Sequence, residues 1–184
     1  MKFGFLLFVT ILAMTNSDAQ ISNSDSLSEK IIAAFRKQKF EDYKMLLLNS
    51  ADYQEMLKDY FENNNYPITE QKEAIKKAKH FDDTADVHYA REFKRLLEKG
   101  INIGIDWTQI KKVKFVFNEQ KPSNSGNTVL SGHLNFSYKD SSYTFFGIEV
   151  YKLSSGYKIS EIRTVLKGEI GQYVDPDLLD DDDN

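Results

Sequence analysis

Apolar and polar residues alternate with a period of two between residues 127 and 166, which is the pattern of half-buried strands. Two turn-forming segments, 139–142 and 154–156, divide this stretch into three runs. The middle run, 143–153, is apolar on both faces, as expected for a central strand of a curled sheet. The pattern therefore predicts three consecutive antiparallel strands, and a shorter alternating run over 112–117 predicts another strand before them.

The N-terminal half of the chain shows the spacing of amphipathic helices instead. Segments with this spacing are 26–39, 40–48, 53–61, 69–80 and 84–99. The first begins with a capping box, and the last is predicted to start at Thr84, to end at Gly100 and to continue as extended chain over 101–105. Helices followed by an antiparallel meander predict an α+β fold, with N-terminal helices packed on a curled antiparallel sheet of about four strands.

This order of elements resembles the nuclear transport factor 2-like fold of the cystatin-like group. Segment 31–37, with Phe40 and 46–47, is similar to the first helix and turn of that group. Segment 156–162 resembles its last strand, in which an aromatic residue is followed by Lys-Ile and a polar break. The resemblance covers about residues 27–165 and implies an exported bacterial member with a cone-shaped cavity between helices and sheet. It implies no particular activity, because enzymes, binders and transport adaptors share the fold.

The two ends of the chain differ in composition from the rest. Lys2, an apolar run over 3–14 and a small-x-small site at 17–19 predict a signal peptide over residues 1–19. The apolar run is shorter than the roughly 20 residues that span a bilayer. We therefore expect a secreted or periplasmic protein without a transmembrane segment, built as a single domain over 20–174. Six aspartates within 175–184 predict an acidic disordered tail.

Composition excludes several kinds of function. The chain has no cysteine, which excludes disulfides, thiolate nucleophiles, cysteine metal sites and a lipid-modified cysteine. The formal net charge is -4, and it becomes +2 without the six aspartates of the tail, which does not indicate nucleic-acid binding. There is no nucleophile elbow, phosphate-binding loop or dinucleotide fingerprint.

The densest group of potential metal ligands lies between His80 and His88. These histidines are eight residues apart, unlike the i, i+4 pair of a zinc-binding helix. Asp82, Asp83 and Thr84 between them are residue types that ordinarily cap a helix. The acidic tail lacks the glycine and the distal glutamate of a calcium loop. We therefore predict no metal and no cofactor.

Five residues are candidates for ligand binding: Trp107, Glu149, Tyr138, Tyr151 and His133. Trp107 stands outside any periodic run, so it is a candidate for an aromatic side chain that faces a ligand. On strict alternation Glu149 shares a strand face with Phe145 and Tyr151, and burial there would shift the pKa of its carboxyl. The alternatives are that Glu149 reaches water or pairs with Arg163 or Lys158, and that His133 faces solvent.

We therefore hypothesise a non-catalytic exported domain that binds a small apolar ligand or a protein partner. Enzymes of the resembled fold, such as ketosteroid isomerases and scytalone dehydratases, place an acid-base residue inside the cone, so an isomerase or dehydratase is one alternative. No matched set of their catalytic residues can be placed on this chain. A structural accessory domain with a filled cone is the other alternative. Related folds often dimerise through the exposed sheet face, so a homodimer is a further hypothesis.

Overall fold

A computed structural model describes residues 24–120 and 128–171 of the chain. In this part the helices are α1 (Ser24–Lys37), α2 (Phe40–Lys44), α3 (Ser50–Asn64), α4 (Ile68–Ala78), α5 (Phe81–Asn102) and a short 3-10 helix η1 (Trp107–Gln109). The strands are β1 (Lys111–Gln120), β2 (Thr128–Tyr138), β3 (Ser141–Leu153) and β4 (Gly156–Lys167). The predicted signal peptide (1–19) and acidic tail lie outside the described residues. No helix of the described part is long and apolar enough to span a membrane.

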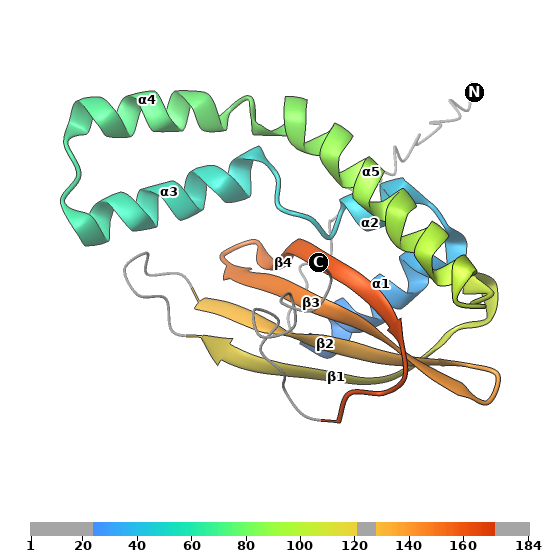
Figure 1. Ribbon diagram of the computed structural model, residues 1–184. Coiled ribbons are helices and arrows are strands. Elements are labelled where there is room, and N and C mark those ends of the chain that lie inside the picture. Colours follow the sequence, from blue (N-terminus) through green and yellow to red (C-terminus); the bar gives the residue numbers. More distant parts are fainter. Residues whose placement is uncertain (1–23, 121–127, 172–184) are drawn as a thin grey trace, which may run out of the picture.

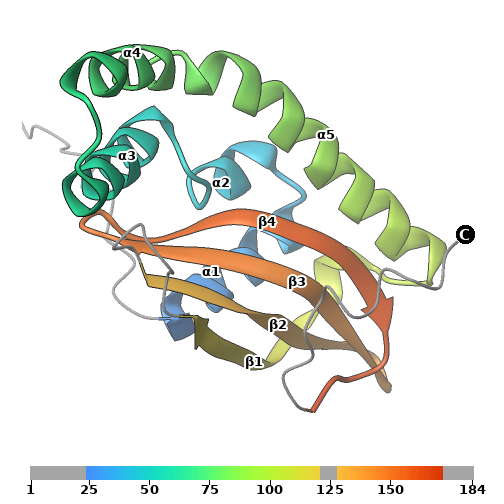
Figure 2. The same cartoon turned by 60° about the vertical axis from the view of Figure 1, so that its left-hand side comes forward.

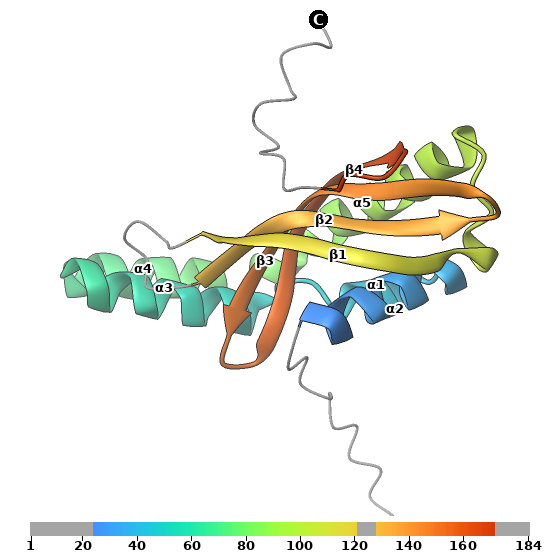
Figure 3. The same cartoon turned by 90° about the horizontal axis from the view of Figure 1, so that it is seen from below.

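The sheet has the order β1-β2-β3-β4, and each strand runs antiparallel to the next. Helices α1, α2 and α5 lie on one side of it, whereas α3 and α4 form a pair that extends beyond the sheet (Figures 1 and 2). Figure 3 shows β3 and β4 turning away from the direction of β1, so that the sheet is curled. The predicted α+β architecture, with helices first and a curled antiparallel sheet after them, is confirmed.

A bulge at Gly147 changes which residues of β3 face the helices. Gly147 has φ +65 and is the extra residue in the pairing of β3 with β2. Before the bulge Phe145 lies in the core, and after it Ile148 does. The prediction that Glu149 shares a face with Phe145 is therefore wrong: Glu149 and Tyr151 lie on the opposite face of the sheet. A slip of one residue exchanges the two faces of a strand, and a bulge introduces such a slip.

The centre of the fold, between helices and sheet, is filled by aromatic rings. Trp107 contacts Phe35, Phe136 and Phe145, with ring centroids 5.1, 5.9 and 5.7 Å from the indole. All four side chains are essentially inaccessible to solvent. The resemblance implies a cavity in the cone, and in this structure the aromatic cluster occupies that region.

Helix α5 extends beyond its predicted bounds at both ends. It begins at Phe81 rather than Thr84, and the Thr84 hydroxyl hydrogen-bonds back to the carbonyl of Phe81. It continues to Asn102, so residues 101–102 are helical rather than extended. Gly100 lies inside the helix because the indole of Trp107 packs on its backbone, where a side chain would collide. A glycine that would end an isolated helix is here retained within the helix by tertiary packing.

Candidate functional site

The five predicted site residues do not come together. Trp107 and Tyr138 lie in the core on the helix side of the sheet, whereas Glu149, Tyr151 and His133 lie on the opposite face. Trp107 is 1% exposed and donates a hydrogen bond from Nε1 to the carbonyl of Leu97, at 2.9 Å. Its ring is enclosed by protein, so the indole offers no open face to a ligand.

Glu149 and Tyr151 form a polar pair on the outer face of the sheet. The Ser160 hydroxyl donates to Glu149 Oε1 at 2.8 Å, and the Glu149 carboxylate lies close enough to Tyr151 to influence its phenol group. Burial raises the pKa of Tyr151 to about 12, and the neighbouring Glu149 carboxylate adds to that shift. The cations predicted as possible partners of Glu149 have other anions nearby, since Lys158 lies 3.7 Å from Asp52 and Arg163 lies 3.7 Å from Glu161.

His133 is fully buried, so the expectation that it faces solvent is wrong. Residues 168–171 follow β4 and pass over the outer face of the sheet. His133 Nε2 and Asn135 Nδ2 both donate to the carbonyl of Ile170, at 2.8 and 2.7 Å. The Thr144 hydroxyl lies 2.7 Å from Asn135 Oδ1 and 2.9 Å from the carbonyl of Gly168. His133, Asn135 and Thr144 form a polar strip that would be exposed on an isolated sheet. Residues 168–171 cover this strip because the chain returns over it after β4.

The burial of His133 predicts that acid weakens the fold. Burial lowers the pKa of His133, and the positive charge of Lys114 on β1 acts in the same direction. Nδ1 has no hydrogen-bond partner among the described residues, so a proton there would be buried and unpaired. The unfolded chain therefore takes up this proton at a higher pH than the native one, near the ordinary histidine value of about 6.5. Stability from neutral His133 is present above that pH and is lost as the pH falls through the folded pKa.

Urea denaturation at pH 7.5, 6.0 and 5.0 measures this effect. The wild type is expected to lose stability over this range, and His133→Gln, which cannot gain the proton, is expected to lose less. His80 is exposed on the surface, so His80→Gln serves as the matched control and should keep the wild-type pH dependence. Parallel pH profiles for the wild type and His133→Gln would contradict the prediction.

The segment between His80 and His88 shows no metal centre. Asp82 accepts a hydrogen bond from the backbone N–H of Ser50 at 2.7 Å, and therefore caps α3 rather than α5. His80 contacts Asp83, and Asp86 pairs with Lys44 of α2. Among the described residues there is no group of three or more histidine, aspartate and glutamate side chains placed to hold a metal ion.

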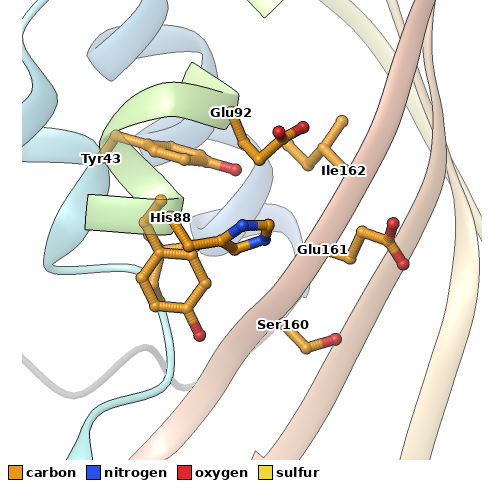
Figure 4. Close-up of a pocket in the computed structure, with 8 residues that line it drawn as sticks. Tyr43, His88, Glu92, Ser160, Glu161 and Ile162 are labelled. Atoms are coloured by element: carbon orange, nitrogen blue, oxygen red, sulfur yellow. The ribbon is translucent and has the colours of Figure 1, made fainter. Parts of the chain in front are cut away.

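A groove of about 420 Å³ lies between helices α2 and α5 and the edge strand β4. Its lining residues are Tyr43, Leu47, His88, Tyr89, Glu92, Ser160, Glu161 and Ile162 (Figure 4). None of them is among the five predicted site residues. The groove therefore lies at the edge of the sheet, away from the filled centre of the cone.

The groove brings together three separate segments of the chain. His88 and Glu92 are four residues apart on α5 and so project from the same side of the helix. The segment after α2 pairs with the edge of β4 through hydrogen bonds between Leu48 N–H and the Ile159 carbonyl and between Ile159 N–H and the Leu46 carbonyl. A register shift opposite Glu149 leaves Ser160 as an extra residue of β4. The irregular edge of β4 forms the wall of the groove that faces α5.

Tyr43 combines a buried ring with a hydroxyl group that faces the groove. The residue is 3% exposed, and its ring stacks on Phe93 with centroids 4.9 Å apart. No hydrogen bond joins its hydroxyl to any described residue, and Figure 4 shows that hydroxyl directed toward the side of the groove that carries Glu92. Burial raises the pKa of Tyr43 far above its usual range, and the nearby Tyr89, Glu92 and Glu161 raise it further. The hydroxyl is therefore neutral and available to a ligand.

The charges around the groove are unevenly placed. Glu92 receives a hydrogen bond from Arg95 Nε at 2.6 Å, and Arg95 also donates to the Arg163 carbonyl at 2.7 Å, which ties α5 to β4. Glu161 has a longer contact, 3.7 Å, with Arg163. The lining itself contains two carboxylates and one histidine but neither lysine nor arginine.

Sequence reasoning considered His88 only as one end of the group of possible metal ligands between His80 and His88. The i, i+4 spacing of His88 and Glu92, which puts both on one side of a helix, is the signal in the sequence that could have found this wall of the groove. Nothing local indicated that β4 would face them. No protein-family model, curated protein or solved structure matches the chain. The groove and the residues that line it are therefore the features of this chain that bear on its function.

Proposed function

We propose that this chain is an exported, non-catalytic binding module that holds a small ligand in the groove between α5 and β4. The observation that carries the proposal is the Tyr43 hydroxyl, which is neutral, faces the groove and has no hydrogen-bond partner among the described residues. A volume of about 420 Å³ falls in the range of small-molecule sites. Leu47 and Ile162 supply apolar surface, and the tyrosines and carboxylates supply polar contacts that would orient a ligand.

Export and family membership belong to the same proposal. The signal-peptide pattern of residues 1–19 supports export to the periplasm or the medium. The order of helices and the curled antiparallel sheet support membership of the nuclear transport factor 2-like superfamily. In such a member the ligand site would lie at the β4 edge, because aromatic side chains fill the cone.

The groove is better suited to hydrogen bonding than to proton transfer. A general base works best with a pKa near the operating pH. Burial instead raises the pKa of Tyr89 to about 12, with contributions from Asp82, Asp52 and Asp86, and it raises that of Tyr43 further. The enzymatic alternative, an isomerase or dehydratase, is favoured by a different observation, the partly buried Glu149 carboxylate that accepts a hydrogen bond from Ser160 beside Tyr151 on the outer face of the sheet.

Native mass spectrometry of the protein, purified gently from its own host, tests the proposal. We expect the mass of a chain that lacks residues 1–19, with a bound molecule small enough for the groove. The same spectrum shows whether the chain is a monomer or the hypothesised homodimer. A full-length mass in an exported fraction would contradict cleavage, and a clean mass without ligand would favour an accessory domain that acts through its surface.

Two substitutions at neighbouring positions of α5 test whether the ligand binds in the groove. His88→Trp places a large ring in the groove and is expected to abolish copurification of the ligand. Val87→Trp is the matched control, because Val87 is 72% exposed and does not line the groove. Equal occupancy in the two variants would place the ligand elsewhere.

A further inference from the structure

We infer that helix α4 binds reversibly to the surface of anionic phospholipid membranes through three lysines, Lys72, Lys76 and Lys79, which we call the lysine stripe. The contact lies on the pair of helices α3 and α4, separate from the groove between α5 and β4, so it does not rest on the proposed ligand function. It follows from the open position of α4, from the separation of charge on the helix pair and from apolar side chains exposed at its tip.

Helix α4 lies on the outside of the molecule. Helix α3 stands between α4 and the sheet, and the turn that joins the two helices is the end of the pair furthest from α5 (Figures 1 and 2). Within α4 Ala78 is buried, Gln71, Ala74 and Ile75 are half-buried, and the other residues are exposed. Helix α4 therefore packs along one narrow side and leaves the rest of its surface open.

The lysine stripe occupies one side of this open surface. Its three residues follow one another at spacings of four and three, which places them in a row on a helix. Lys79 follows the last residue of α4 and keeps helical backbone angles, so it continues the row. All three side chains are exposed, and none forms an ion pair or hydrogen bond with a described residue. Their charges are therefore available to a partner.

The carboxylates of α4 lie on a different side of the helix. Glu70 and Glu73 are three residues apart, and Glu73 pairs with Lys77 at 3.1 Å. By the helical repeat this group is centred roughly 130° around the axis from the lysine stripe. The stripe therefore carries positive charge without a carboxylate among its own residues.

The acidic residues of α3 are directed toward the sheet. Asp52 and Glu55 accept hydrogen bonds at 2.7 Å from the two serines in the turn between β3 and β4. Asp59 and Glu62 follow at helical spacing and share this side of α3. Because α3 stands between α4 and the sheet, the helix pair carries its negative charge on the sheet side and the lysine stripe on the outer helix (Figure 1).

Apolar side chains are exposed where the stripe begins. Ile68 is 68% exposed and lies one turn before Lys72 on the same side of α4. Tyr66 is 37% exposed, and the contacts of its ring with Tyr60 and Phe61, each with centroids 5.5 Å apart, hold it at the tip of the helix pair. Lysines beside exposed apolar and aromatic residues are typical of helices that lie in a membrane interface.

A lipid surface fits this arrangement better than a small anion does. The stripe extends over about 10 Å of helix, so its lysines do not converge on one point. An anionic bilayer presents a plane of phosphate groups, and each lysine close to such a plane strengthens binding roughly fivefold. The apolar residues at the tip can then enter the boundary between headgroups and acyl chains. The proposed export would place the chain beside such a surface.

Vesicle flotation tests this assignment on the protein as it is purified from its host. Vesicles made of phosphatidylglycerol and phosphatidylcholine in equal amounts should carry the protein, whereas vesicles of phosphatidylcholine alone should not. Added salt should release the protein, because contacts between exposed charges are screened. Equal binding to both kinds of vesicle, or binding to neither, would overturn the inference.

Two adjacent lysines of α4 provide a matched pair of variants. Lys76→Gln removes one charge from the stripe and should weaken binding to the anionic vesicles roughly fivefold. Lys77→Gln removes the same charge from the side that pairs with Glu73 and should leave binding close to that of the wild type. Both side chains are exposed, so the fold tolerates either change. Equal losses in the two variants would attribute binding to net charge and contradict a role for the stripe.

A second pair of variants tests the apolar contact. Ile68→Gln should weaken binding to the anionic vesicles, whereas Val87→Gln, at a residue of α5 that is 72% exposed, should not. Equal affinities of the wild type and Ile68→Gln would overturn the apolar part of the inference.

The acidic segment 175–184 of the same chain is the other occupant that charge would allow. If the vesicles do not bind but a peptide of that sequence does, and Lys76→Gln abolishes this binding, the stripe receives the end of its own chain and the membrane assignment is overturned.

Discussion

Trp107→Ala is expected to lower the free energy of unfolding by about 3 to 5 kcal/mol, the usual cost of deleting a large buried side chain. Trp107 is 1% exposed and touches rings from α1, β2 and β3, so its removal leaves a cavity where helices and sheet meet. It also removes the donor to the Leu97 carbonyl. Urea denaturation followed by circular dichroism measures the loss.

Two controls define what this result means. Ile101 is a 57% exposed apolar residue at the end of α5, and Ile101→Ala should cost no more than about 0.5 kcal/mol. Trp107→Phe keeps a ring in the cluster and is expected to fall between Trp107→Ala and the wild type. A cost below about 1 kcal/mol for Trp107→Ala would contradict a filled cone and would reopen the predicted role of this residue in ligand binding.

Gly100→Ala is expected to destabilise the fold by about 1 to 3 kcal/mol, as overpacking in a core usually does. A Cβ at Gly100 would lie 2.6 Å from Cε2 of Trp107 and 2.9 Å from Cη2, so the indole would have to move. Alanine is intrinsically better than glycine in a helix by about 1 kcal/mol, so the observed loss is what remains after that gain. Chemical denaturation of the wild type and of Gly100→Ala measures this loss of stability.

The sign of this effect should reverse in a Trp107→Ala background. Without the indole the only remaining contribution is helix propensity, and Gly100→Ala becomes neutral or stabilising by up to about 1 kcal/mol. Gly171→Ala provides the control for a new methyl group in open space, because a Cβ there would meet no atom within 4 Å. An equal cost of Gly100→Ala in both backgrounds would show that Trp107 is not its cause.

The architecture was predictable because it follows from local periodicity. The alternation over 127–166 and the helical spacing before it predict the kind and order of the elements, and both agree with the structure. The bounds of α5 were less predictable. Its continuation through Gly100 depends on Trp107, which is seven residues away and packs on the helix only in the folded chain.

The positions of the predicted site residues could not be obtained from local sequence patterns alone. The assignment of strand faces was correct up to Phe145 and failed beyond it, because one bulged glycine moved Glu149 to the other face. His133 was expected in solvent, but it is covered by a segment 37 residues further along the chain. The groove residues were not predicted as a set, since Tyr43 and Glu161 become neighbours only when β4 pairs with the segment after α2.

By itself, the sequence determined the α+β class, the order of helices and strands and the expectation of an exported chain. The tertiary structure decided which aromatic residues fill the cone, which polar strip is covered and where a groove forms. The physical reason is the range of the interactions. Hydrophobic periodicity acts between residues two to four positions apart, whereas burial and cavity formation depend on which distant surfaces meet.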